Sequence, residues 1–313
     1  MSHFTGEYFK TLAIGAYDYL AGNYDYCYLD AMHYKNRKQG ADKIIVGSSH
    51  TMNGVIEGIV GDSVINFSIS SQDLYFDYLH IKKAIEEGKK QIQTCIINIG
   101  YYMIYQDLSR SRMLGPMISS VYYPLFQDPH NYKGDLSYDC LEGIRQIENR
   151  SLQISVYQDW ARGYFMEQGS YYGGNVTREN NNILGLKKVK WSEMTIEEKE
   201  NYARERASRH NKIRKYTDSF AENINIISEM VELLAAHQVR CVFLICPFTR
   251  YYNKYIDAGF RTEIFEVLDG LKAPVEFYDI NEFGDDFTDA DFLDSDHLND
   301  VGAEKLSKML RVL

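Results

Sequence analysis

Short apolar runs that alternate with amphipathic segments constrain the fold of this chain more than any other feature. The runs are rich in Ile and Val, and glycine or proline follows several of them directly. Such runs indicate buried strands, and the helical patterns between them require crossover connections, as in a parallel sheet with both faces covered. We expect strands at residues 42–46, 63–67, 94–99, 239–246 and 275–280.

Amphipathic helices are predicted between these strands. In the segment 71–87, Leu74, Tyr78, Ile81 and Ile85 fall on one helical face. Similar patterns cover residues 220–236, 255–271 and 300–313. The sequence therefore predicts an α/β fold, a doubly wound parallel sheet flanked by helices.

The strand and helix rhythm is lost between about residues 105 and 215, which contain turns, aromatic residues and a charged stretch. We interpret this segment as a large, mostly helical or irregular insertion over the carboxyl edge of the sheet, a lid or substrate platform. Residues 1–40 are rich in tyrosine and are interpreted as an arm that packs on the domain or forms an interface. The α/β domain itself is expected to cover residues 41–313.

Composition limits which binding partners and which cellular compartment are expected. A net charge of -10 over 313 residues argues against nucleic-acid binding, which needs a clustered basic surface. No apolar run reaches the roughly 18 residues of a spanning helix, and no secretory signal is visible, so we expect a cytoplasmic protein without a membrane span. The odd number of cysteines favours reduced, buried thiols: Cys27, Cys95, Cys140, Cys241 and Cys246.

The first strand is followed by Gly47, Ser48 and Ser49, which puts a hydroxyl where open α/β sheets bind ligands. A serine nucleophile needs a base within hydrogen-bond reach and an acid that orients the base. Asp294 and His297 are three residues apart and can supply both. The alternatives are that the serines cap a helix or line a turn, and that Asp294 belongs to a solvated acidic loop.

Taken together, the two segments resemble the SGNH (GDSL-like) hydrolase superfamily. There the nucleophile sits in a Gly-Asp-Ser or Gly-Ser-Ser block after the first strand, and a late Asp-x-x-His block, commonly followed by Leu-Asn and a glycine, supplies the acid and the base. The resemblance implies that Ser49 is the nucleophile, Asp294 the orienting acid and His297 the base. It also implies a flavodoxin-like strand arrangement.

The family's oxyanion hole is only partly represented. The run from Asn66 to Asp73 resembles the second block, with Ser71 where a glycine is usual; a main-chain N–H is the donor there. Residues 100–103 read Gly-Tyr-Tyr-Met where the family has Gly-x-Asn-Asp, so Tyr102 replaces the asparagine donor. Because one donor is worth about 3 kcal/mol, we expect either a substitute among Tyr101, Tyr102 and Asn53 or slow turnover.

The Gly-Ser-Ser block, the Ser-Gln pair of the second block and residues 246–252 are similar to the DltD-like proteins of teichoic acid D-alanylation. The resemblance implies an esterase or O-acyltransferase acting on an ester of a glycan-like or other small alcohol through an acyl-enzyme on Ser49, with Arg250 and Tyr101 as candidate substrate-binding residues. The alternative is a catalytically impaired protein of the same fold that binds a glycan or a partner protein. The oligomeric state stays open.

Other motifs add little chemistry. The cysteines lack paired metal-ligand spacing, and neither a Walker loop nor a Gly-x-Gly-x-x-Gly run occurs, so we expect no metal and no cofactor. His50 is interpreted as structural or peripheral, because adjacent residues point apart. The basic residues between Arg204 and Arg214 are interpreted as a solvated helix face, with a phosphate-bearing substrate as the alternative.

Overall fold

The computed structural model describes residues 40–87, 91–136, 191–282 and 286–313. Their centre is a five-stranded parallel sheet with the strand order β2-β1-β3-β4-β5. The strands are β1 (Lys43–Val46), β2 (Val64–Asn66), β3 (Thr94–Asn98), β4 (Arg240–Ile245) and β5 (Glu276–Asp279). Each expected strand is present, with ends that differ by at most one residue.

Burial on both faces explains why these segments were recognisable as strands. Every residue of β3 is buried, and so is β4 beyond its first residue. In the paired register Cys95 lies opposite Cys241, and both thiols, like that of Cys246, are buried and free. Burial raises the pKa of all three. The expected reduced thiols are thus confirmed for these three cysteines, whereas Cys27 and Cys140 lie outside the described residues.

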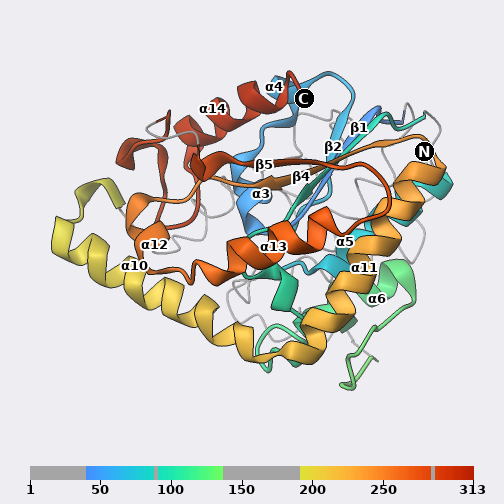
Figure 1. Cartoon of the computed structure of the whole chain (residues 1–313), viewed down its shortest axis with the longest axis horizontal. Helices are drawn as coiled ribbons and strands as arrows, with labels where there is room; N and C mark the ends of the chain where they lie inside the picture. Colours follow the sequence, from blue (N-terminus) through green and yellow to red (C-terminus); the bar gives the residue numbers. More distant parts are fainter. Residues whose placement is uncertain (1–39, 88–90, 137–190, 283–285) are drawn as a thin grey trace, which may run out of the picture. The chain divides into compact units, whose positions relative to one another are not determined.

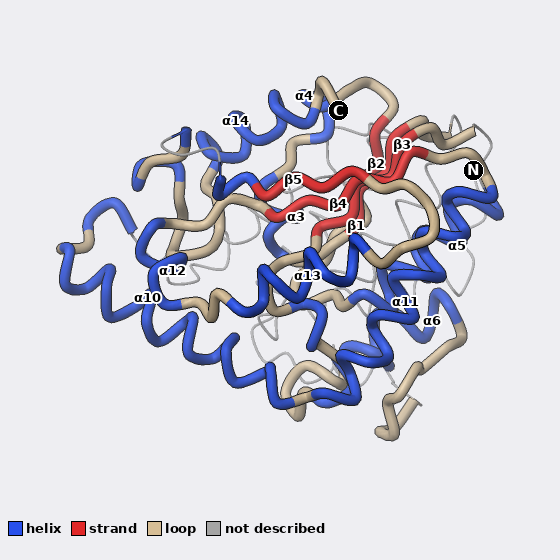
Figure 2. Tube along the Cα trace, in the orientation of Figure 1, coloured by secondary structure: helices blue, strands red, loops and turns tan. Residues whose placement is uncertain are grey.

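Helices cover both faces of the sheet, which makes the fold doubly wound (Figures 1 and 2). On one side α5 (Leu74–Glu87) and α11 (Thr217–Ala236) pack against each other, with α13 (Gly259–Asp269) on the same side. On the other side α3 (Ser49–Gly54) and α4 (Glu57–Val60) pack against α14 (Asp300–Leu310). The direction of strand addition reverses after β2, so right-handed crossovers place α5, α11 and α13 on the face opposite to α3 and α4.

The helix expected over residues 255–271 is divided. α12 (Arg250–Tyr255) ends at Ile256, which is extended, and α13 begins only at Gly259. The Asp257 carboxylate accepts the Gly259 N–H at 2.8 Å, so a local side-chain hydrogen bond to the backbone lies inside the expected helix, at the start of α13. Likewise Asp73 accepts the Phe76 N–H at 3.2 Å, and α5 starts at Leu74 instead of Ser71.

α10 (Ile196–Asn211) belongs to the compact unit that contains the sheet, whose described residues are 40–87, 91–107, 191–282 and 286–313. The helix opens with a capping box between Thr195 and Glu198 and packs on α12. The sequence analysis places residues up to about 215 in the insertion. In the structure α10 groups with the sheet unit, and one of its faces is buried.

The described residues 108–136 belong to a second compact unit. They form the turns η2 (Leu108–Arg110) and η3 (Ile118–Tyr122) and the helix α6 (Tyr123–Phe126). Residues 1–39 and 137–190, which include most of the expected arm and insertion, lie outside the described residues. The remaining short helical turns belong to the sheet unit: η1 (Met103–Tyr105), η5 (Trp191–Glu193), η6 (Lys212–Lys215), η7 (Ile280–Glu282) and η9 (Asp289–Asp291).

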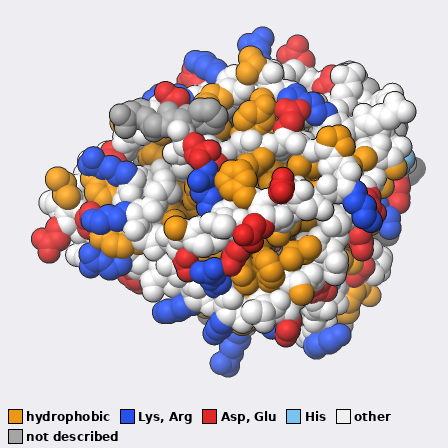
Figure 3. All heavy atoms as spheres, viewed as in Figure 1, with side chains coloured by type: hydrophobic (Ala, Val, Ile, Leu, Met, Phe, Trp, Pro, Cys, Tyr) orange, Lys and Arg blue, Asp and Glu red, His pale blue; other side chains and the backbone are white. Residues whose placement is uncertain are grey.

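In the part of the chain that the structure describes, no helix has both the length and the apolar character needed to cross a bilayer. On the face seen in Figure 3, acidic and basic side chains are interspersed and do not separate into large regions of one sign.

Candidate active site

Gly47 sets the geometry at the carboxyl end of β1. Its φ of +150° favours glycine, and a Cβ there would come within 2.5 Å of the Asn98 Cβ and 2.6 Å of the Thr51 Oγ1. The tight passage makes Ser49 the first residue of α3. Ser49 is partly exposed, whereas Ser48 beside it is buried. The turn therefore presents one of the two hydroxyls at the surface.

The C-terminal loop brings a base to that hydroxyl. The Ser49 Oγ lies 2.8 Å from His297 Nε2, across a separation of 248 residues. The Nδ1 of the same ring lies 3.0 Å from each carboxylate oxygen of Asp294. With the proton on Nδ1, the imidazole donates to Asp294 and its Nε2 accepts from the serine hydroxyl. We call Ser49, His297 and Asp294 the outer triad.

The loop around His297 is held by its own main chain. Asp294 Oδ1 accepts hydrogen bonds from the N–H groups of Asp296 (3.0 Å) and His297 (2.8 Å). These main-chain contacts hold the carboxylate in place independently of its contact with the imidazole. Asn299 then caps α14 by accepting from Val301 and Gly302.

A glycine is needed at position 302, because a Cβ there would meet the Asp291 carbonyl oxygen at 2.2 Å. The Leu-Asn-x-x-Gly sequence after His297 thus shapes the turn that carries the imidazole.

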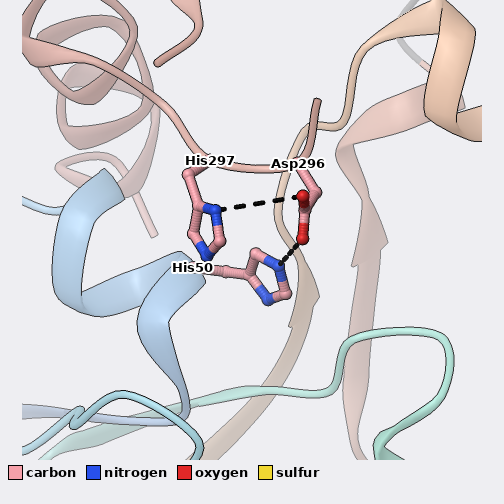
Figure 4. A group of neighbouring side chains, drawn as sticks. All are labelled: His50, Asp296 and His297. Carbon is pink, nitrogen blue, oxygen red and sulfur yellow. Dashed lines mark hydrogen bonds and ion pairs between the residues drawn. The ribbon is translucent and has the colours of Figure 1, made fainter. Parts of the chain in front are cut away.

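A second set of the same groups lies behind the outer triad. Ser48 Oγ is 3.2 Å from His50 Nδ1, and His50 Nε2 is 3.4 Å from Asp296 Oδ2. We call these residues the inner triad. Figure 4 shows the ring of His50, which comes from α3, next to the ring of His297, which comes from the C-terminal loop, and each ring contacts the carboxylate of Asp296. The two imidazoles stack with centroids 5.0 Å apart and an interplanar angle of 21°.

Arg206 on α10 binds the inner carboxylate. Its Nε lies 3.1 and 3.0 Å from the two oxygens of Asp296, and the Ser295 hydroxyl donates to the same carboxylate at 3.0 Å. Burial by itself disfavours ionisation of Asp296, but the charges of His297 and Arg206 outweigh it and hold the pKa well below its usual range. The inner carboxylate is therefore an anion at neutral pH.

The two histidines differ in charge tendency. Burial lowers the pKa of His50 despite its hydrogen bond to Asp296, so this ring is neutral at neutral pH. Burial also opposes the charging of His297, but the Asp294 and Asp296 carboxylates outweigh it and raise the pKa of this ring. The site thus stabilises a proton on His297 and disfavours one on His50.

Groups of the kind that bind metals converge here, since ligand atoms of His50, Asp296 and His297 all lie within 4.8 Å of one another. Arg206 already neutralises Asp296, and Asp294 already binds the Nδ1 of His297. A cation between these residues would have to displace both contacts. The arrangement fits a hydrogen-bonded network better than a metal centre.

The candidate oxyanion donors have different surroundings. Ser71 has a φ of 63°, a backbone conformation that glycine adopts more easily than serine, and its N–H makes no hydrogen bond within the described residues. Asn53 donates to the main-chain oxygen of Ser49 at 2.9 Å. The Tyr102 ring is buried, stacks on His210 at 3.8 Å and meets His50 edge-on at 6.3 Å.

The hydroxyl of Tyr102 makes no hydrogen bond to any described residue, and burial raises its pKa, so it stays a proton donor.

The two candidate substrate-binding residues point to other partners. Tyr101 donates its hydroxyl to Asp279 at 2.8 Å, and Arg250 at the start of α12 donates to the Tyr251 hydroxyl at 2.9 Å. The structure brings neither side chain into contact with the outer triad.

The sequence analysis missed three residues of this site: Asp296, Arg206 and His210. A signal for two of them existed, because Ala203, Arg206, Ala207 and His210 recur at helical spacing and form the inward face of α10. Arg204 and Arg209 are exposed, so the solvated face that we expected is only part of this helix.

A search of protein-family models and of curated protein sequences finds nothing that matches this chain.

Proposed function

We propose that this protein is a serine-dependent esterase or O-acyltransferase of the SGNH type, acting on an ester of a glycan-like or other small alcohol. The observation that carries the proposal is the continuous path from the Ser49 hydroxyl through His297 to Asp294, with contacts of 2.8 and 3.0 Å. These are the distances at which an imidazole can take a serine proton as the oxygen attacks.

In the proposed reaction, Ser49 Oγ attacks the ester carbonyl carbon while His297 Nε2 takes the hydroxyl proton. The tetrahedral intermediate collapses, His297 gives its proton to the departing alcohol, and the acyl group stays on Ser49. Water or a second alcohol then attacks the acyl-enzyme, again losing its proton to His297, which returns it to Ser49. Asp294 holds the imidazole in the required tautomer throughout.

Two donors are available for the negative charge on the carbonyl oxygen. The Ser71 N–H and the Tyr102 hydroxyl both lack a hydrogen-bond partner among the described residues. Each is expected to contribute up to about 3 kcal/mol to the transition state if it reaches the oxyanion. We propose Tyr102 as the replacement for the asparagine of the related enzymes.

A second candidate function is binding without turnover. It is favoured by the same Tyr102, because an aromatic ring stacked on His210 takes the place of the amide donor. In this alternative the protein holds a glycan or a partner protein over an intact but unproductive triad.

Covalent labelling with a fluorophosphonate probe separates the two functions. We expect labelling of the wild-type protein, none in Ser49→Ala, and labelling retained in Ser48→Ala, because the Ser48 side chain is buried. If the folded wild-type protein neither labels nor hydrolyses short acyl esters, the binding function replaces the enzymatic one. Adding polyol acceptors to the ester assay then distinguishes hydrolysis from acyl transfer.

A further inference from the structure

The inner triad repeats the hydrogen-bond order of the outer one, yet its burial excludes the same use. Ser48, His50 and Asp296 are each only 1% exposed. The side chains of His297 and Asp294 are 12% and 15% exposed, and Ser49 is partly exposed. Substrate can reach the outer hydroxyl and not the inner one, so the inner groups act on the outer ones.

Two contacts connect the inner triad to His297 of the outer triad. The His50 ring stacks on His297 at 5.0 Å, and His50 is in turn packed edge-on against Phe248 at 5.1 Å. Asp296 Oδ1 lies 3.9 Å from His297 Nδ1, a little farther than the Asp294 oxygens at 3.0 Å (Figure 4). The plane of the base and the charge beside it are both set by inner residues.

Arg206 fixes the inner carboxylate in this position. It reaches Asp296 from α10, while His50 reaches it from α3, so two helices hold one anion that comes from the C-terminal loop. An anion this close to Nδ1 favours the imidazolium that forms in the proposed reaction. The neutral His50 ring adds no opposing charge.

We propose that His50 and Asp296 are positioning residues for His297, and that Asp296 is a second acid that takes over part of the role of Asp294 when that carboxylate is removed. This inference rests on the proposed function for its kinetic consequences only. Its structural consequence, the control of the proton on His297, is independent of turnover.

Several charged and titratable groups face His297, and each enters the expected result. They are Asp294 and Asp296 from its own loop, His50 from α3, and Arg206 and His210 from α10. The two carboxylates stabilise the proton on His297, and Arg206 opposes it. Removing Asp296 and removing Arg206 should therefore move the titration of His297 in opposite directions.

The first measurement is an NMR titration of the His297 imidazole, assigned by the signal lost in His297→Gln. We expect a lower pKa in Asp296→Asn and a higher one in Arg206→Gln, with no change in the matched control Asp289→Asn, which removes a carboxylate paired with Lys199. Opposite shifts are not produced by general loosening of the fold. Shifts of the same sign, or none, would overturn the proposal even if the protein is not an enzyme.

The second measurement is a double-mutant cycle on kcat and KM for an activated ester, with Asp294→Asn, Asp296→Asn and both together. Asparagine at 294 keeps an oxygen for the two N–H groups that it accepts, so the loop is preserved. We expect the double variant to lose at least about fivefold more in kcat than the product of the single losses, with KM little changed. Losses that simply multiply would refute the role of Asp296 as a second acid.

Discussion

Replacing Gly47 with alanine tests whether the turn between β1 and α3 is as tight as the structure indicates. The added methyl group would lie 2.5 Å from the Asn98 Cβ and 2.6 Å from the Thr51 Oγ1, well inside van der Waals contact. Asn98 is the last residue of the buried strand β3 and cannot swing away, since Cβ belongs to the rigid part of the side chain. The backbone of one strand end has to move.

The expected cost combines two effects. Forcing a methyl group into a packed site costs about 1–3 kcal/mol, and an alanine at a φ of +150° adds about 1–3 kcal/mol of backbone strain. Alanine also reduces the conformational entropy of the unfolded chain, which offsets about 0.4–1 kcal/mol of this cost. Gly47→Ala should therefore lower the free energy of unfolding by about 1–5 kcal/mol.

Urea denaturation followed by circular dichroism measures this change from the midpoint and slope of the transition. The matched control is Gly58→Ala in α4, where a Cβ meets nothing within 4 Å; a helical alanine should raise stability there by about 0.5–1 kcal/mol. A Gly47→Ala protein with the wild-type midpoint, or a higher one, would refute the close approach of β1 and β3 at this turn.

Further predictions concern buried polar groups. Burial raises the pKa of Glu57 to about 8. Between about pH 4.5 and pH 8 the folded state therefore keeps a proton that the unfolded state has lost. The free energy of unfolding should fall by up to about 1.4 kcal/mol for each unit by which the pH rises through this range. Glu57→Gln should flatten that fall in unfolding experiments at pH 5 and pH 8; an unchanged slope would contradict the buried protonated carboxyl. Asn223 donates from α11 to the carbonyl oxygens of Ile104 (3.1 Å) and Gln106 (2.9 Å), and Asn223→Ala should cost about 1–3 kcal/mol in the same assay. The exposed Asn225→Ala on the same helix should stay within about 0.5 kcal/mol of wild type, and equal losses in the two variants would show that the bridge contributes nothing.

The sheet was predictable because its signal is local. Residues 95–97 and 241–245 are apolar on both faces, a pattern typical of a parallel strand that is covered on both sides. The helix boundaries were less predictable, because a side-chain carboxylate such as that of Asp257 can bind a backbone N–H within an apolar pattern that continues past it. Propensity and periodicity do not record which hydrogen bond ends a helix.

Within the candidate site, the residues that the sequence marked were those with a local motif. Ser49 follows a strand, and Asp294 and His297 share one turn, so both ends were visible separately. For His50 the sequence predicts a structural or peripheral role, because adjacent residues such as Ser49 and His50 point apart.

The partner of His50 is Asp296, 246 residues away, and no local pattern encodes such a pairing. The same applies to Arg206, because the carboxylate that it binds belongs to Asp296, 90 residues later in the chain.

The distance along the chain between Ser49 and His297 also has a consequence for biosynthesis. At typical translation rates, the ribosome needs between about 12 and 50 seconds to add the 248 residues that separate them. During that interval the nascent polypeptide contains Ser49 and not His297, so the hydrogen bond between their side chains can form only late in synthesis or after it.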